Sequence, residues 1–177
     1  MPSVNSDIRN IQPDPTDSVL EILTGIVDPE IPVLNVVELG IIRGVESLGE
    51  TVTVRITPTY SGCPAMYAME EEITRRLRMI GYETVNVERV FDEAWTTDWM
   101  TADAREKLRR YGIAPPAHIV TEGGPATGGA SPARTAVACP RCGSSRTELR
   151  SYFGSTACKS VHYCDDCAEP FEAFKCI

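Results

Sequence analysis

The sequence has little of what a membrane-bound or secreted protein needs. None of its apolar stretches is long enough to cross a bilayer, which takes about 20 consecutive apolar residues. Residues 1–12 are polar and contain no apolar run of the length found in a signal peptide. We therefore expect a cytoplasmic protein that does not act at a membrane.

Positive charge is also scarce. The chain has 17 Lys and Arg residues against 25 Asp and Glu residues, a formal net charge of −8, and no cluster of Lys or Arg forms a basic patch. The resulting negative field repels a phosphate backbone. We therefore expect no nucleic-acid partner.

Histidine occurs only twice, as His118 and His162. Both lie far along the chain from Cys63, so no local motif pairs a cysteine with a histidine base. The sequence also lacks the glycine fingerprint of nucleotide binding and the paired Glu-x-x-His motifs of a di-iron bundle. We expect neither oxygenation nor flavin reduction, and no other catalysis, from this chain alone.

Composition divides the 177 residues into four segments. Helical and strand patterns are followed by a stretch rich in Gly, Pro, Ala, Ser and Thr, and six of the seven cysteines come after it. Such a stretch cannot offset the entropy of ordering by burying apolar surface. We predict a flexible N-terminus (1–15), an α/β domain (16–114), a linker (115–137) and a small cysteine-rich module (138–177).

Hydrophobic periodicity predicts an α+β fold for the first domain. Extended runs at 40–45 and 51–57 predict an antiparallel hairpin, and a third strand is expected at 84–90. Helices are expected at about 18–27, from Cys63-Pro64 to about residue 80, and at 101–111, with an ordered extended loop over 28–32. This order indicates a small sheet with helices on one face.

Two C-x-x-C turns, Cys139-Pro-Arg-Cys142 and Cys164-Asp-Asp-Cys167, are separated by 21 residues. Each turn places two thiolates close together, and two such turns can close a tetrahedral four-sulfur shell around Zn²⁺. The segment is too short to build an adequate core without such a staple. We predict a zinc ribbon with a structural ion.

Alternatives remain for these cysteines. The two turns could form disulfides, and Cys158, Cys164, Cys167 and Cys176 have spacings close to those of a plant-type [2Fe–2S] ferredoxin. If zinc takes the two turns, Cys158 and Cys176 are left as buried residues, a redox pair or auxiliary ligands. His162 is expected at the surface.

Cys63 lies between the second predicted strand and the second predicted helix. If Pro64 is the first helical residue, Cys63 occupies the N-cap, where backbone donors and the helix dipole favour a thiolate. The alternative is a merely buried cysteine. Asp28, Glu30 and Glu38 would approach it if the loop after the first helix folds over the hairpin.

Two motifs resemble a known family. Asp28-Pro-Glu-Ile-Pro-Val-Leu34 with Glu38-Leu-Gly40, followed by Pro58-Thr-Tyr-Ser-Gly-Cys-Pro64, resembles the SufT-like iron–sulfur assembly domain over roughly residues 16–91. That family often has Asp-Leu-Gly where this chain has Glu38-Leu-Gly. The resemblance implies cluster handling by Cys63, with Asp28, Glu38 and Thr59 as further candidates, and a transient iron–sulfur cluster.

A wider resemblance covers most of the chain. It rests on Trp95-Thr-Thr-Asp-Trp99, Tyr111-Gly-Ile-Ala-Pro-Pro116, Cys139-Pro-Arg-Cys-Gly-Ser144, Phe153-Gly-Ser-Thr-Ala-Cys-Lys159 and Glu169-Pro-Phe171. These residues are similar to those of the family of D components encoded with the multicomponent phenylacetyl-CoA epoxidase. The resemblance implies an accessory role beside a di-iron subunit and an iron–sulfur flavin reductase in phenylacetate catabolism.

Three functions follow as hypotheses. The chain could assist cluster assembly or delivery to the reductase through Cys63, with a cluster bridged between two copies in a homodimer. It could instead be a non-catalytic structural subunit of the epoxidase. Or it could be a small electron carrier that uses the C-terminal cysteines.

Overall fold

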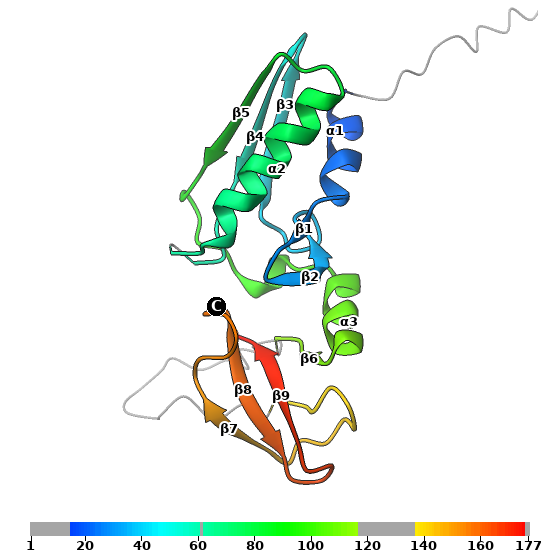
Figure 1. Cartoon of the computed structure of the whole chain (residues 1–177), viewed down its shortest axis with the longest axis vertical. Coiled ribbons are helices and arrows are strands. Elements are labelled where there is room, and N and C mark those ends of the chain that lie inside the picture. Colours follow the sequence, from blue (N-terminus) through cyan, green and yellow to red (C-terminus); the bar gives the residue numbers. More distant parts are fainter. Residues whose placement is uncertain (1–14, 61, 117–136, 176–177) are drawn as a thin grey trace, which may run out of the picture.

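The computed structural model describes residues 15–60, 62–116 and 137–175. Most of the predicted flexible N-terminus and linker, together with His118 and Cys176, lies outside the described residues. The described chain forms an N-terminal domain of helices and strands, with a C-terminal sheet beneath it in the view of Figure 1. No helix in these described ranges is both long enough and apolar enough to span a membrane.

The N-terminal sheet has three strands in the order β3 (Ile42–Leu48), β4 (Thr51–Ile56) and β5 (Thr84–Arg89). β3 and β4 form the predicted antiparallel hairpin, and β5 runs parallel to β4. Parallel neighbours need a crossover, which α2 (Ala65–Met79) supplies. Alternate residues of β4 are buried beneath it.

α1 (Pro15–Thr24) and α2 cover one face of this sheet, as the sequence indicates (Figure 1). α1 packs against β3 and α2. It begins before Ser18, because Pro15 suits the first helical position and Ser18 lies inside the helix instead of capping it. The predicted start at residue 18 is therefore wrong by three residues.

Residues 28–32 are not the expected extended loop. β1 (Val27–Asp28) and β2 (Ile31–Asn35) form a small antiparallel hairpin. The Asp28 Oδ1 atom accepts a hydrogen bond of 2.7 Å from the backbone N–H of Glu30, which closes the turn. Pro32 is tolerated because a two-stranded sheet leaves one side of each strand unpaired.

A short 3-10 helix, η1 (Thr97–Trp99), precedes α3 (Ala102–Tyr111). Thr101 caps the start of α3 by accepting from the N–H of Ala104, and Gly112 ends it with φ +91. α3 packs against β2 and against β6 (Ile113–Ala114), which follows at once. The predicted helix at 101–111 is confirmed.

The C-terminal sheet, which we call the ribbon (137–175), contains β7 (Thr147–Ser151), β8 (Lys159–Cys164) and β9 (Glu169–Phe174). Its strand order is β6-β9-β8-β7. β6 belongs to the segment assigned to the first domain from the sequence, yet it pairs in parallel with β9. The ribbon therefore takes one edge strand from the N-terminal part of the chain.

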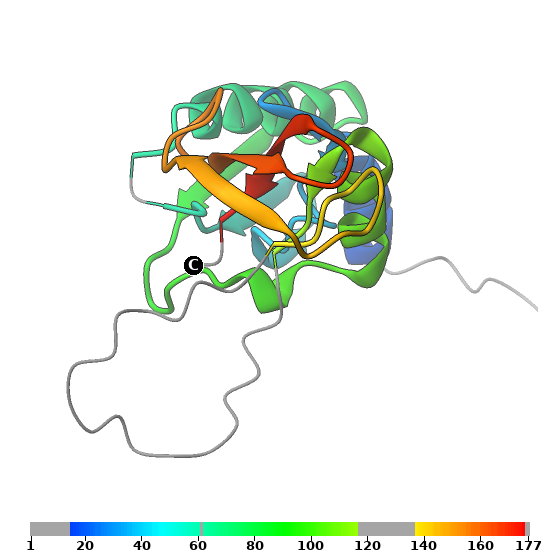
Figure 2. The same cartoon turned by 90° about the horizontal axis from the view of Figure 1, so that it is seen from below.

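The two parts also share a hydrophobic core. Cys158 and Phe174 of the ribbon belong to the same buried cluster as α1, β4 and α2. Trp95 contacts Phe174 and donates a hydrogen bond of 3.0 Å from Nε1 to the Leu39 carbonyl. Seen from below in Figure 2, the ribbon covers one end of the N-terminal domain.

Candidate metal and thiol sites

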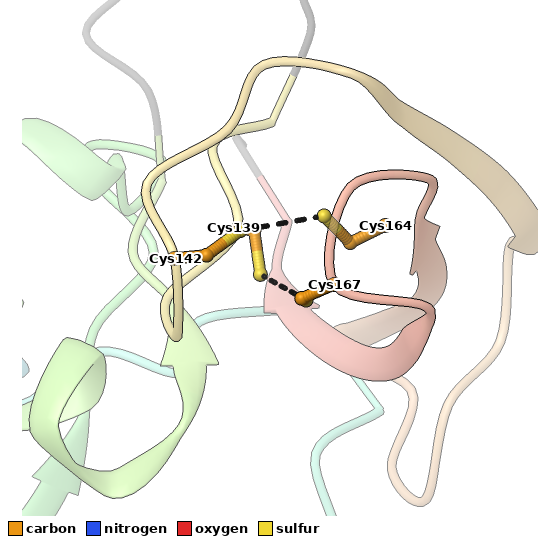
Figure 3. Close-up of side chains that lie close together, drawn as sticks. All are labelled: Cys139, Cys142, Cys164 and Cys167. Atoms are coloured by element: carbon orange, nitrogen blue, oxygen red, sulfur yellow. Dashed lines mark hydrogen bonds between the residues drawn. The ribbon is translucent and has the colours of Figure 1, made fainter.

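Figure 3 shows the four cysteines of the C-x-x-C turns close together, at the end of the ribbon where β8 finishes. Their sulfur atoms all lie within 4.8 Å of one another. The Cys139 and Cys167 sulfurs are 3.7 Å apart, and those of Cys142 and Cys164 are 3.5 Å apart. The predicted four-sulfur grouping is thus present in the fold.

Local backbone geometry builds each turn. Gly143, at φ +77, closes the first turn, and its N–H donates to the Cys139 carbonyl at 2.9 Å. Cys164 ends β8, and Ala168, at φ 57, lets the chain return into β9. The two turns lie at the same end of the sheet, because Thr147, at the start of β7, pairs with Cys164, at the end of β8.

The spacing of the sulfurs fits a tetrahedral ion. Zn–S bonds of about 2.3 Å place the sulfurs of a regular tetrahedron about 3.8 Å apart, close to the 3.5 and 3.7 Å found here. Backbone N–H groups, that of Cys167 first, lower the pKa of Cys164 to about 7. Burial raises the pKa of Cys167 in the same group to about 12, so the four neighbouring thiols do not all favour the thiolate that binds a metal.

The ferredoxin-like set of cysteines is not assembled. Cys158 lies just before β8 and Cys164 at its other end, so six strand steps of about 3.3 Å separate them by roughly 20 Å. One cluster cannot reach both. Cys176, the fourth member, lies outside the described residues.

His162 is not the surface residue expected from the sequence. It is 8% exposed, its Nε2 lies 3.0 Å from Ser160 Oγ, and its ring stacks on Phe171. Burial lowers the pKa of His162. The side chain faces inward because His162 lies on the buried face of β8. The prediction considered His162 by itself and not the burial pattern of the strand.

Cys63 is half-buried. It is not the N-cap of α2, as predicted, but the residue before it, because Pro64 occupies the N-cap and Ala65 is the first helical residue. Its N–H donates to the Tyr60 carbonyl at 3.2 Å. Burial raises the pKa of Cys63 and outweighs the N–H groups of Ala65 and Met66, which lower it. The helix start thus favours the thiolate, as expected, but burial has the larger effect on the pKa of Cys63.

Two of the acidic candidates act on Cys63 through their charges. The negative charges of Glu30 and of the buried Asp28, both on the β1–β2 hairpin, raise the pKa of the Cys63 thiol. Glu38 instead pairs with Lys107 of α3 and accepts from the N–H of Asn35 at 3.3 Å. Its carboxylate is thus held against α3.

Thr59, the remaining candidate, is 8% exposed and lies in the segment that joins β4 to Cys63. Sequence reasoning did not single out Tyr60, the next residue of that segment. Burial first, and then the Cys63 thiol, Glu30 and Cys158, raise the pKa of Tyr60 to about 12. Tyr60 stands in the same motif as Cys63, which is the signal that could have drawn attention to it.

Two family models match this chain. Residues 16–89 match an iron-sulfur cluster assembly protein family, and residues 124–175 match the PaaD zinc beta ribbon domain. The first match covers the three-stranded sheet with α1 and α2, and the second includes the four-cysteine site. The expected α+β domain followed by a zinc ribbon is confirmed.

Individual relatives match either nearly the whole chain or about half of it. A protein of Escherichia coli, named as the putative D component of a 1,2-phenylacetyl-CoA epoxidase, is 46% identical over 176 residues, which cover 96% of this chain and 98% of that protein. An "Fe-S protein maturation auxiliary factor" of Porphyromonas gingivalis is 32% identical over 94 residues, 52% of this chain and 89% of that protein. A solved domain of unknown function from Bacillus anthracis superposes with a TM-score of 0.49 at 21% identity, over 52% of this chain and 90% of that one.

Proposed function

This chain belongs to the PaaD family, the D components of phenylacetyl-CoA epoxidase, and from that premise we propose that it is a non-catalytic accessory component of the epoxidase system. We propose that it assists the assembly or delivery of an iron–sulfur cluster through Cys63. The observation that carries the proposal is the position of Cys63, half-buried at the start of α2 within a matched iron–sulfur assembly domain.

The surroundings of Cys63 suit a transient cargo. A buried thiol with a raised pKa holds its proton until a cation replaces it, so metal binding and release are linked to proton exchange. The nearby carboxylates of Asp28 and Glu30 favour a cationic species at this place. The cluster is cargo here and not a resident cofactor.

The ribbon has a different task in this proposal. Cys139, Cys142, Cys164 and Cys167 would hold one structural Zn²⁺, since four sulfurs fill a tetrahedral shell and leave no open position for chemistry. The ion would stabilise both C-x-x-C turns, including the one that joins the end of β8 to the start of β9. The ribbon would then present a surface to the client.

The proposed client is the reductase component, because it is the epoxidase component that carries an iron–sulfur cluster in the family that this chain resembles. Free thiols suit the reducing cytoplasm, where we place the protein. A cluster needs more ligands than Cys63 alone offers. Those ligands come from the client during transfer, or from a second copy in a homodimer.

The second candidate function is a structural subunit of the epoxidase. The packing of Cys63 against the core of the N-terminal domain favours it, since a packed thiol needs no further role. In that case the chain would co-purify with the epoxidase at fixed stoichiometry, and removal of the thiol would affect only stability.

Co-expression with the reductase distinguishes cluster delivery from a purely structural role. The reductase is purified from cells that contain wild type, Cys63→Ala or, as a matched control on the exposed face of α2, Glu71→Gln. Iron and acid-labile sulfide in the reductase should fall with Cys63→Ala alone, and chemical reconstitution should restore activity. Full cluster loading beside Cys63→Ala would refute the delivery role and leave the structural subunit.

A further inference from the structure

β5 is a long and regular edge strand. Four strands lie at the edges of the two larger sheets: β3, β5, β6 and β7. β6 has only two residues, and the pairings of β3 and β7 each contain a register shift of the kind that a β-bulge produces. Short and bulged edges discourage pairing with another chain. β5 has six residues, no proline and an unbroken register with β4, and within the described ranges no strand pairs with its outer edge (Figure 1).

The backbone of β5 offers hydrogen-bonding groups at this free edge. At the start of β5 the N–H of Thr84 donates to a carbonyl on the side of β4 at 3.2 Å, and just after its end the N–H of Val90 does so at 2.8 Å. The N–H and C=O groups of successive residues alternate between the two edges of a strand. Those of Val85 and Val87 therefore point away from β4, where an added strand can bond them.

A groove runs beside this edge, between β5 and α2. Its volume is about 720 Å³, and its lining includes Val87 of β5 and Thr74, Arg75 and Met79 of α2. Some recognition domains hold an extended peptide at such a place: the peptide backbone pairs with the edge strand, and its alternate side chains enter neighbouring pockets. The groove and the free edge thus form one surface that fits an extended segment.

The two ends of the groove differ in charge. At one end the Glu70 carboxylate is neutralised by Arg89, whose Nη2 donates to it at 2.9 Å. At the other end lie Arg75 and Arg78. Glu72 pairs with Arg75, but the exposed Arg78 guanidinium has no hydrogen-bond or ion-pair partner among the described residues. That end can therefore accept a carboxylate, although the chain as a whole is acidic.

These charges indicate which occupant fits and how it is oriented. Because α2 leads from the end of β4 back to the start of β5, Arg78 lies beside the first residues of β5. A segment antiparallel to β5 places its C-terminal residues at this end, where carboxylates pair with Arg78. A second copy of this chain fits less well, since pairing of two β5 strands puts Arg75 and Arg78 of both copies on the same face of the joined sheet.

We propose that the groove between α2 and β5 binds an extended, acidic segment of a partner protein. The segment adds to the sheet antiparallel to β5, bonds the outward N–H and C=O groups of Val85 and Val87, and places its C-terminal carboxylates at Arg78. Neither Cys63 nor any of the four ribbon cysteines lines this groove. The proposal therefore does not depend on cluster delivery.

A synthetic peptide tests the groove directly. The probe is fluorescein-labelled Lys-Thr-Val-Thr-Val-Thr-Asp-Asp with a free carboxyl end, and its binding to full-length, zinc-loaded protein is followed by fluorescence anisotropy. It should bind saturably, because the main-chain bonds to a strand edge can be made by any extended backbone. A peptide that ends in Lys-Lys instead should bind at least about tenfold more weakly, since like charges then meet at Arg78.

Two variants locate the binding. Arg78→Glu should weaken it at least about tenfold, whereas Arg110→Glu, the same charge change at a 75% exposed side chain of α3, should behave as wild type. Val87→Pro should abolish binding, because proline removes an N–H from the free edge and no bond to β4. Circular dichroism shows whether each variant is folded. Equal affinity of folded Arg78→Glu and wild type would overturn the proposal.

Amide exchange on wild type keeps the test valid if a variant folds poorly. The N–H groups of Val85 and Val87 should exchange more slowly once the acidic peptide is bound. Unchanged exchange at both residues, or no saturable binding up to about 1 mM peptide, would refute the groove. Slow exchange there without peptide, together with a dimer in analytical ultracentrifugation, would assign the edge to a second copy and overturn the proposal as well.

Discussion

Trp95 and Phe174 pack against each other across the junction between the N-terminal domain and the ribbon, with ring centroids 6.0 Å apart and ring planes inclined by 53°. Trp95 is 3% exposed, and so is Phe174. Two fully buried aromatic rings are among the largest apolar groups that a small domain can bury. The position of the ribbon is therefore fixed by core packing as well as by strand pairing.

Removal of this contact should destabilise the whole described chain. Phe174→Ala is expected to lower the free energy of unfolding by about 3–5 kcal/mol, the usual cost of a large buried aromatic. Phe153→Ala is the matched control, because Phe153 lies on the same ribbon but is 70% exposed; its cost should stay within about 0.5 kcal/mol. Urea unfolding followed by tryptophan fluorescence measures both, and equal losses would contradict a shared core.

Loss of a ribbon thiolate should remove the structural metal. Cys164→Ser is expected to release zinc and unfold β7, β8 and β9, because the remaining three sulfurs no longer close the shell. The N-terminal sheet should stay folded, since its own hairpin and helices support it, but with a lower free energy of unfolding, because unfolding of β9 removes Phe174 from the shared core. Metal analysis and amide exchange of β3–β5 against β7–β9 provide the readout. Near-unit zinc in this variant would contradict the four-cysteine assignment.

Acid should weaken an ion-pair network on α2. Hydrogen bonds from Arg75 and Arg76 lower the pKa of Glu72 to about 2, from an ordinary value of 4.5. A carboxyl whose pKa is lowered by folding stabilises the fold fully at pH values above its ordinary pKa of 4.5. This stabilisation is lost as the pH falls toward about 2.

Glu72→Gln should therefore be less stable than wild type by about 0.5–1 kcal/mol at neutral pH, and the difference should disappear near pH 2. Glu71→Gln, at the exposed neighbouring position, should follow wild type at every pH. Urea midpoints between pH 2 and 7 give the comparison. A difference between Glu72→Gln and wild type that persists unchanged at low pH would show that the arginines do not act through this carboxylate.

Gly40 should not tolerate any side chain. Its φ is +75, and a Cβ atom added there would lie 2.5 Å from the Trp99 carbonyl oxygen. Gly40→Ala combines a left-handed backbone with a backbone clash and should cost more than about 3 kcal/mol. Gly81→Ala, at φ +110 with open space around it, should cost about 1–2 kcal/mol from strain alone. Equal thermal midpoints for the two variants would show that η1 can move away.

Hydrophobic patterns within single stretches of the sequence were sufficient to predict much of this fold. The alternation in β4 and the apolar stripe of α2 predict the hairpin, the crossover helix and the face that they share, because each pattern reflects burial against a neighbour in sequence. The spacing of Cys139, Cys142, Cys164 and Cys167 likewise predicts their grouping, since each pair sits on its own turn.

Contacts between distant segments were not predictable in this way. β1 has only two residues, too few for an alternation to show, and β6 finds its partner in β9, more than fifty residues later. The raised pKa of Cys63 arises from burial and from carboxylates on another hairpin, which outweigh the helix start that its local sequence suggests.

The pairing of β6 with β9 bears on what holds the two halves of this protein together. Residues 117–136 connect them covalently, but β6, at the end of the N-terminal half, already completes the sheet of the C-terminal half. The connecting segment thus acts as a tether that raises the local concentration of one half near the other. A chain cleaved within that segment would yield two complementary fragments that recognise each other through strand addition and a common core, much as separate subunits do.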